Sequence, residues 1–385
     1  MTSAKKLSKN KLFPQPLKVC VTGDVHIGHP RIPMYDLCYH LDKYFLPKVK
    51  ESNFTVLAGD VWDSLLTMST ETTKPVISIV IDLLKIADEN NVVLRVLRGT
   101  FDHDRDQSTL FETLHEKGHL KNNFRYISTI TCEYIEELGI RVLYIPDSLP
   151  YKTSDDCMVY IHKLLGDLGW TTVDYAIVHG SFEHRFPPGI PLPKCTFRHE
   201  QFKDLVTRYV LCNHIHTADF YKNILYSGSF ERMVHGEEEK KGFIYLTDDG
   251  IKAKIQFIEN ADATKFNTFD LTQYTDPSEV VNQYEQRLQG YTGDTPWFVR
   301  IKHQSSEIRK LLANYTKQKY PMIRFSALIE TQTSTTILDA KELFDLTSLT
   351  KPSPESLPQI VFDRVVLTDP TMTMDDVRDL LSRCG

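Results

Sequence analysis

The sequence predicts an α/β fold in which two packed sheets are flanked by helices, followed by a smaller α/β domain. Short apolar runs rich in β-branched residues recur between residues 18 and 258, with helical apolar spacing between several of them. This alternation is typical of layered α/β domains. Several runs also end in Asp or His, at the strand ends where open α/β sheets place their binding sites.

The strands are predicted from short apolar runs with high β-propensity. They are residues 18–23, 54–59, 92–98, 140–145, 173–178, 208–213, 223–227, 242–247 and 252–258. Apolar residues three and four positions apart predict helices at residues 36–51, 73–90, 108–118 and 156–169. The helix at 73–90 is rich in Val, Ile and Leu, which is expected of packing against the core.

A second unit is predicted after residue 262, from helical patterns at 279–291 and 306–319 and strand patterns at 297–303 and 322–330. A short amphipathic helix is expected at 371–385, either packed back on its own domain or docked on a partner. The predicted parts are an extension, a main domain, a small α/β domain, and a linker with a C-terminal segment. Their boundaries are 1–17, 18–262, 263–338 and 339–385.

Composition limits the class of protein. At 385 residues the chain can hold a domain of about 250 residues and smaller parts. Its net charge of −6 gives no compositional support for nucleic-acid binding. Seven cysteines without a Cys-x-x-Cys pair are expected to be reduced thiols of a cytoplasmic protein. No apolar run is long enough to cross a bilayer, so no membrane association is expected.

Asp and His residues follow five of the predicted strands. One such residue alone is ordinarily a helix cap or a core histidine. Here Asp24-x-His26 and His214-x-His216 each place two ligand-type side chains one residue apart. Because alternate residues of an extended chain point to the same side, each pair can grip one ion. Carboxylate and imidazole donors suit Mn²⁺, Fe²⁺ or Zn²⁺ at a hydrolytic centre.

The order of these clusters resembles that of calcineurin-like metallophosphoesterases: Asp-x-His, Gly-Asp-x-x-Asp, Gly…His-Asp, His-Gly and x-His-x-His. The resemblance covers residues 18 to about 258. The stretch YSGSFERMVHGEEEKKGFIYL (226–246) is similar to a Gly-Ser-x-Glu-Arg…Gly-Glu…Lys-Gly-Phe segment of the SbcD family, the nuclease subunits of an SbcC/SbcD-type DNA repair complex. The departures described below resemble those of bacteriophage members. The resemblance implies a metallophosphoesterase two-sheet sandwich, with residues 263–338 as a capping domain that presents DNA.

The resemblance also implies a role for each site residue. Asp60 would bridge two ions, so that one hydroxide binds both and attacks a phosphodiester in line. Asp63 is expected to order a loop or a ligand, His103 to be the catalytic histidine, and Asp104 to orient the ring of His103. The remaining ligands are divided between the two ions: Asp24, His26 and His216 for one, His179 and His214 for the other.

The turn after the third strand departs from the family pattern, which reads Gly-Asn-His-Asp or Gly-Asn-His-Glu. Here it is GTFDHD (99–104). With His103 and Asp104 kept in register, Asp102 occupies the position of the ligand Asn and is expected to bind the second ion. The alternative is that Asp102 points away and water completes that ion. A second departure is Asn213, which replaces Gly before His214 and is expected to tolerate left-handed backbone.

The resemblance implies a two-metal-dependent DNA nuclease, an exonuclease on duplex ends and an endonuclease on single strands, in DNA repair, recombination or replication. The expected cofactors are two divalent ions, Mn²⁺ foremost, with Mg²⁺, Fe²⁺ or Zn²⁺ also suitable. The expected partners are DNA, an SbcC-like SMC-type ATPase and a second copy of the chain. The expected location is the cytoplasm of a bacterial or phage-infected cell, or the nucleus in a eukaryote.

Two other functions stay open: a small-molecule or cyclic-nucleotide metallophosphoesterase, and a catalytically impaired scaffold that binds DNA ends. Two loops are also left open. The proline-rich residues 183–199 are either a surface loop or a wall beside the substrate. The charge run at 236–242 is expected to form a hairpin turn without a chemical role.

Overall fold

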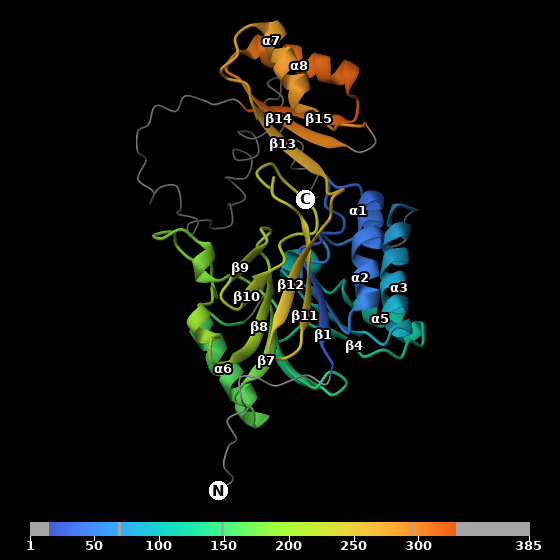
Figure 1. Ribbon diagram of the computed structural model, residues 1–385, viewed down its shortest axis with the longest axis vertical. Coiled ribbons are helices and arrows are strands. Elements are labelled where there is room, and N and C mark those ends of the chain that lie inside the picture. Colours follow the sequence, from blue (N-terminus) through green and yellow to red (C-terminus); the bar gives the residue numbers. More distant parts are fainter. Residues whose placement is uncertain (1–14, 68–70, 148–149, 294–295, 329–385) are drawn as a thin grey trace, which may run out of the picture. The chain divides into compact units, whose positions relative to one another are not determined.

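The computed structural model describes residues 15–67, 71–147, 150–293 and 296–328, which belong to one compact unit. Most of the predicted extension at 1–17, the end of the predicted small domain and the segment 339–385 with its expected helix lie outside the described residues. Within the described ranges the fold is mixed α/β, with three sheets and helices between their strands (Figure 1).

The first sheet has the strand order β12-β11-β1-β2-β3-β4. Strands β1 to β4 run parallel, whereas β11 is antiparallel to β1 and to β12. Its bounds are β1 Leu17–Thr22, β2 Phe54–Ala58, β3 Val93–Leu97, β4 Phe124–Ile127, β11 Gly242–Asp248 and β12 Ala253–Glu259.

The second sheet has the order β5-β6-β7-β8-β10-β9, with a parallel centre and antiparallel strands at both edges. Its bounds are β5 Thr131–Ile135, β6 Ile140–Ile145, β7 Val173–His179, β8 Val206–Asn213, β9 Asp219–Tyr221 and β10 Ile224–Tyr226. Side chains of both sheets form one buried core, in which Val19 and Val56 meet Tyr175 and Leu211. The two sheets therefore pack face to face as a sandwich.

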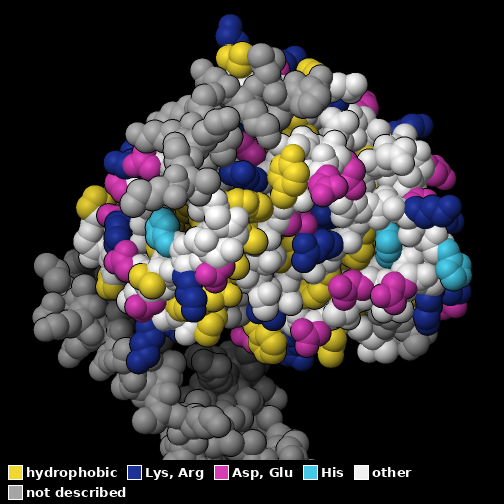
Figure 2. All heavy atoms as spheres, turned by 90° about the horizontal axis from the view of Figure 1, so that it is seen from below, with side chains coloured by type: hydrophobic (Ala, Val, Ile, Leu, Met, Phe, Trp, Pro, Cys, Tyr) yellow, Lys and Arg dark blue, Asp and Glu magenta, His cyan; other side chains and the backbone are white. Residues whose placement is uncertain are grey.

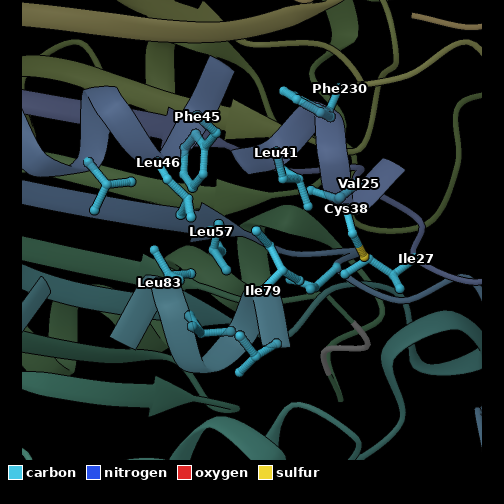
Figure 3. Close-up of a cluster of buried hydrophobic side chains, with 14 of the residues drawn as sticks. Val25, Ile27, Cys38, Leu41, Phe45, Leu46, Leu57, Ile79, Leu83 and Phe230 are labelled. Atoms are coloured by element: carbon cyan, nitrogen blue, oxygen red, sulfur yellow. The ribbon is translucent and has the colours of Figure 1, made fainter. Parts of the chain in front are cut away.

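Helices cover the outer faces of this sandwich (Figure 1). The predicted helix at 36–51 consists of α1 (Met34–His40), a π-helical stretch (Leu41–Phe45) and α2 (Leu46–Glu51). Figure 3 shows Phe45 and Leu83 approaching Leu57 of β2 in the core on this side. The other helices are α3 (Lys74–Glu89), α4 (Phe101–Asp104), α5 (Thr109–Lys117) and α6 (Ser154–Asp167).

Helix α3 confirms the core packing expected of residues 73–90, because its apolar face is buried.

Strand β1 contributes side chains to two hydrophobic cores, because successive residues of a strand point to opposite faces of the sheet. Val19 and Val21 of β1 face the second sheet, whereas Cys20 between them packs under the helices. No helix among the described residues combines the length and apolar character needed to cross a membrane.

The third sheet is parallel, in the order β13-β14-β15, and carries its own core with α7 and α8. Both helices begin at residues with matching caps: Asp276 accepts a hydrogen bond from Glu279 N, and Ser305 from Ile308 N. The bounds are β13 Lys265–Asp270, α7 Pro277–Arg287, β14 Trp297–Lys302, α8 Ser306–Lys319 and β15 Ile323–Leu328. The strand and helix patterns predicted here are found, and β13 is an additional strand.

One ion pair lies at the edge of the sandwich core. Arg95 of β3 is 1% exposed and its guanidinium donates to Glu133 of β5 at 2.7 and 3.2 Å. Burial raises the pKa of Glu133, but the hydrogen bonds and charge of Arg95 outweigh it, and the net shift is downward. The exposed Arg125 binds the same carboxylate at 2.7 Å.

We expect Arg95→Met to lower the free energy of unfolding by about 3 kcal/mol, because it leaves a largely buried carboxylate short of its main partner. Arg125→Met is the matched control and should cost at most about 1 kcal/mol. Since the folded pKa of Glu133 lies below its unfolded value of about 4.3, this stabilisation is present above that pH and lost as the pH falls. Urea unfolding of both variants at neutral and acidic pH measures these losses. Equal losses in Arg95→Met and Arg125→Met would contradict the larger contribution assigned to the buried Arg95–Glu133 pair.

Candidate metal centre

The predicted ligands lie at, or just after, the carboxyl ends of four strands, β1, β2, β7 and β8. Asp24 and His26 follow β1, and Asp60 follows β2. His179 is the last residue of β7, and His214 and His216 follow β8. An isolated bridge joins the two sheets here, between Gly23 and Ser229. The sandwich thus brings together residues that are far apart in sequence at one rim.

These side chains form two groups whose donor atoms lie within 4.8 Å of one another: Asp24, His26 and His216, and Asp60, His179 and His214. Asp60 Oδ2 lies 3.3 Å from His179 Nε2 and 4.0 Å from His26 Nε2. One carboxylate oxygen therefore faces both groups. The division of ligands matches the one that the sequence resemblance implies.

Several donor atoms of these groups are buried without a hydrogen-bond partner in the described part of the chain. They are Asp24 Oδ1, both ring nitrogens of His26, His179 Nε2 and His214 Nδ1. The His26 nitrogens and His179 Nε2 have only ion-pair contacts, of 3.3 to 4.0 Å, with the Asp60 and Asp63 carboxylates. Unpaired buried polar atoms cost free energy, so such a cluster is unfavourable unless something binds to it. Divalent cations satisfy carboxylate and imidazole donors together, and Mn²⁺, Fe²⁺ and Zn²⁺ accept this mixture. The residues present fit a pair of metal ions.

The backbone of the same residues is strained. Asp24, His26, Asp60 and His214 have positive φ angles of 46°, 52°, 49° and 108°. Such conformations cost about 1 to 3 kcal/mol each in non-glycine residues and persist where the surrounding structure holds them. Asp24 and His26 are not extended, so the sequence argument that alternate strand residues point the same way is wrong here. A left-handed turn after β1 makes the pair converge instead.

Neighbouring groups fix the orientation of the ligands. His179 Nδ1 lies 2.8 Å from the carbonyl oxygen of Ala58, which leaves Nε2 to face Asp60. Asp24 Oδ2 accepts hydrogen bonds from His214 N at 2.9 Å and from the Asn213 amide at 3.3 Å. Such outer contacts set ring orientation and ligand strength at metal sites.

The ionisable side chains of the site shift one another's pKa values. Burial lowers the pKa of His179, but attraction to Asp60 outweighs burial and raises the pKa to about 10. Burial likewise raises the pKa of Asp60, yet His179 and His26 outweigh it and the net shift is downward. The pKa of His214 is lowered by burial and then by the charge of His179. An ion that binds His179 must displace its proton, which makes binding weaker in acid.

Asp104 has a different role from the predicted one. Its buried carboxylate accepts hydrogen bonds from backbone N–H groups of Asp60 at 3.1 Å, Trp62 at 3.0 Å and Gly99 at 2.6 Å. Burial raises its pKa to about 6. The ring of His103 is held instead by the carbonyl oxygen of Asp63, 2.7 Å from Nδ1. The prediction that Asp104 orients His103 is therefore corrected: Asp104 ties together the loops after β2 and β3.

His103 lies beside the first group, with its ring centroid 4.8 Å from that of His26. The Asp63 carboxylate is 3.4 Å from His26 Nδ1, in keeping with the loop- or ligand-ordering role predicted for it. The turn therefore places one imidazole next to the group of Asp24, His26 and His216. His26, Asp63 and His103 also lie close enough together to form a third set of donor atoms.

Asp102 does not lie near the candidate metal ligands. It lies exposed on α4 and belongs to none of the donor groups among the described residues. Thr100 lies against the shared carboxylate in its place: its N–H donates to Asp60 Oδ1 at 2.5 Å and its hydroxyl to Oδ2 at 3.1 Å. The expected ligation by Asp102 thus does not agree with the structure, which favours the alternative that Asp102 points away.

The proline-rich residues 183–199 line two cavities. One of about 200 Å³ is bounded by His179 and His214 on one side and by Lys194 and Cys195 on the other. A larger one of about 490 Å³ lies within the loop itself, beside His184. The loop therefore forms a wall next to ligand candidates. On the face shown in Figure 2, basic and acidic side chains are interspersed without an extended basic field.

No family model and no curated protein sequence matches this chain. Among solved structures, the crystal structure of TT1561 of Thermus thermophilus is 13% identical, with 63% of this chain and 99% of that chain covered and a TM-score of 0.35. A second crystal structure is 13% identical, with 63% and 100% covered and a TM-score of 0.37. Similarity at this level assigns no function to the chain, so a function has to be inferred from the residues of the site.

Proposed function

We propose that this chain is a two-metal DNA nuclease of the SbcD type, built on a metallophosphoesterase sandwich. The observation that carries the proposal is the pair of buried donor groups that share Asp60 Oδ2, with several donor atoms unpaired. Two divalent ions there, Mn²⁺ foremost, would neutralise phosphoryl charge and lower the pKa of a water. The resemblance of the segment 226–246 to the SbcD family supports a DNA phosphodiester as the substrate.

The chain's own residues supply the rest of the proposed mechanism. Asp104 and Thr100 hold the Asp60 loop in place, so that one carboxylate serves both groups. His103 Nδ1 donates to the Asp63 carbonyl, so Nε2 is the ring nitrogen left for the substrate. We propose that His103, as the imidazolium, would donate from Nε2 toward the phosphate or the leaving oxygen. The proposed partners are DNA, an SbcC-like ATPase and a second copy of this chain.

The proposal is tested with end-labelled linear duplex DNA, single-stranded DNA, para-nitrophenyl phosphate and cyclic nucleotides, each with Mn²⁺, Mg²⁺ or EDTA. We expect DNA degradation that requires Mn²⁺ and stops in EDTA. Turnover of small molecules alone would instead establish a small-molecule phosphoesterase. DNA binding without any turnover, with the ATPase partner present, would establish a scaffold.

His103→Gln should reduce DNA cleavage by about 10²- to 10⁴-fold and leave the Mn²⁺ content unchanged, because a positioned proton donor contributes on that order. Metal analysis beside the cleavage assay checks this. His162→Gln, on the exposed face of α6, is the matched control and should keep both. Loss of metal together with activity would place His103 among the ligands rather than at the reacting phosphate.

A further inference from the structure

The charge run at 236–242, for which a plain hairpin turn is expected, reaches the metal centre. Glu237 Oε1 lies 2.7 Å from Nδ1 of the ligand candidate His216. Its second oxygen accepts a hydrogen bond from Met233 N at 2.9 Å, so the carboxylate is anchored to its own loop. The run therefore contacts a ligand candidate, which its sequence pattern did not indicate.

Lys241 holds the same histidine from the other end. Its side chain is fully buried, and Nζ donates to the carbonyl oxygen of His216 at 3.0 Å. Nζ also lies 3.4 Å from Glu237 Oε2 and 2.6 Å from Glu239 Oε1. A buried ammonium with these partners is a fixed group rather than a solvated surface charge. The loop therefore holds both the ring and the backbone of His216.

The two donor groups differ in how their histidines are supported. In the group of Asp60, the ring of His179 is held by a neutral carbonyl group, that of Ala58. In the group of Asp24, the ring of His216 is held by a carboxylate, that of Glu237. A carboxylate partner fixes the tautomer and strengthens the imidazole as a ligand. With Nδ1 against Glu237, His216 is left with Nε2 for an ion shared with Asp24 and His26.

We propose that Glu237 is a positioning residue for His216 and makes the group of Asp24, His26 and His216 the tighter of the two metal sites. Lys241 acts with Glu237 by fixing its carboxylate and the His216 backbone. This inference rests on the proposed two-metal centre. It assigns different affinities to the two ions and identifies the residue that sets the difference.

The experiment is Mn²⁺ titration of the full chain, by calorimetry and by electron paramagnetic resonance, which distinguishes an isolated Mn²⁺ ion from a coupled pair. The variants are Glu237→Ala, Glu237→Gln and the control Glu238→Gln. Glu238 is the exposed neighbour, and its carboxylate accepts from Thr268 N at 3.2 Å. Glutamine keeps an accepting oxygen for only one of the two partners, His216 Nδ1 or Met233 N, and removes the negative charge.

We expect Glu237→Ala to weaken the tighter of the two Mn²⁺ sites by about 10- to 100-fold and to leave the weaker site within about twofold, whereas a loss at the weaker site alone would contradict the proposal. Glu237→Gln should show a smaller loss at the same site, and Glu238→Gln none. Unchanged constants in Glu237→Ala, or equal weakening of both sites with a lower melting temperature, would overturn the positioning role. A wild-type chain that binds no Mn²⁺ would overturn the proposed function itself, and this inference with it.

Discussion

Replacement of Asp60 by asparagine is expected to abolish Mn²⁺ binding at both donor groups and to lower the DNA cleavage proposed for this chain by about a thousandfold or more. One oxygen of Asp60 faces His179 at 3.3 Å and His26 at 4.0 Å, so both groups lose their shared negative charge at once. Asparagine has nearly the same volume, tolerates the φ of 49° and keeps an oxygen for the Thr100 N–H. The substitution thus removes charge and preserves the loop.

Metal content after gel filtration in Mn²⁺ buffer is the measurement, with the melting temperature of the metal-free protein beside it. Asp174→Asn is the control, since Asp174 lies near the start of β7 and accepts from Arg141 N at 2.8 Å. It should keep both ions. Retention of one ion in Asp60→Asn would assign the carboxylate to a single group and refute the shared bridge.

The sequence predicted the central strands well because their signal is strong. Strands such as β2 and β3 are buried along their length, so they appear as continuous apolar runs. The strands that were missed, β4, β5, β9 and β13, are all edge strands. An edge strand pairs on one side and exposes polar side chains, as FRYI (124–127) and DFY (219–221) do. Their apolar pattern is too weak to recognise without the neighbouring strand.

The ligand candidates were predictable because Asp and His stand directly after apolar runs, whereas their supporting groups were not. Asn213 was expected to tolerate a left-handed backbone, but it is the last residue of β8 and does not have a positive φ. Its amide instead donates to Asp24 and to the Gly228 carbonyl. Thr100 and Glu237 lie in loops whose partners are 40 and 21 residues away. No local spacing reveals such contacts. They depend on how loops that are distant in the sequence meet at one rim of the sandwich.

The segment 226–246 shows the same limit. Its Gly-Ser-x-Glu-Arg pattern does not reveal what those residues contact. Glu231 is fully buried and binds the ring of His40 at 2.5 Å, the Asn260 amide at 2.8 Å and Thr264 N at 2.8 Å. Its neighbour Arg232 donates to the Ala263 carbonyl at 3.1 Å. These hydrogen bonds connect the C-terminal end of α1 to the segment that follows β12. Glu231 and Arg232 lie in the same loop as Glu237.

Gly59→Ala is expected to disable the second donor group, although it adds a single methyl group. Gly59 has a φ of 90°, and a Cβ there would lie 2.3 Å from His179 Nδ1 and 2.8 Å from the Gly99 Cα. His179 Nδ1 is also the atom that bonds the Ala58 carbonyl. The methyl group must therefore push the ring away from Asp60 or separate the loops after β2 and β3. Either shift breaks the alignment of a ligand, for which a loss of about 100-fold in activity is expected.

Gly169→Ala is the control that separates the steric clash at Gly59 from the free-energy cost of placing alanine in left-handed backbone. Gly169 has a φ of 69°, and a Cβ there meets nothing within 4 Å. Both substitutions place alanine in left-handed backbone, at about 1 to 2 kcal/mol each. Only Gly59→Ala should weaken Mn²⁺ binding, at the site of Asp60, His179 and His214. If the two variants lose stability equally and both keep two ions, the His179 ring tolerates displacement, and the fixed geometry inferred for this group does not hold.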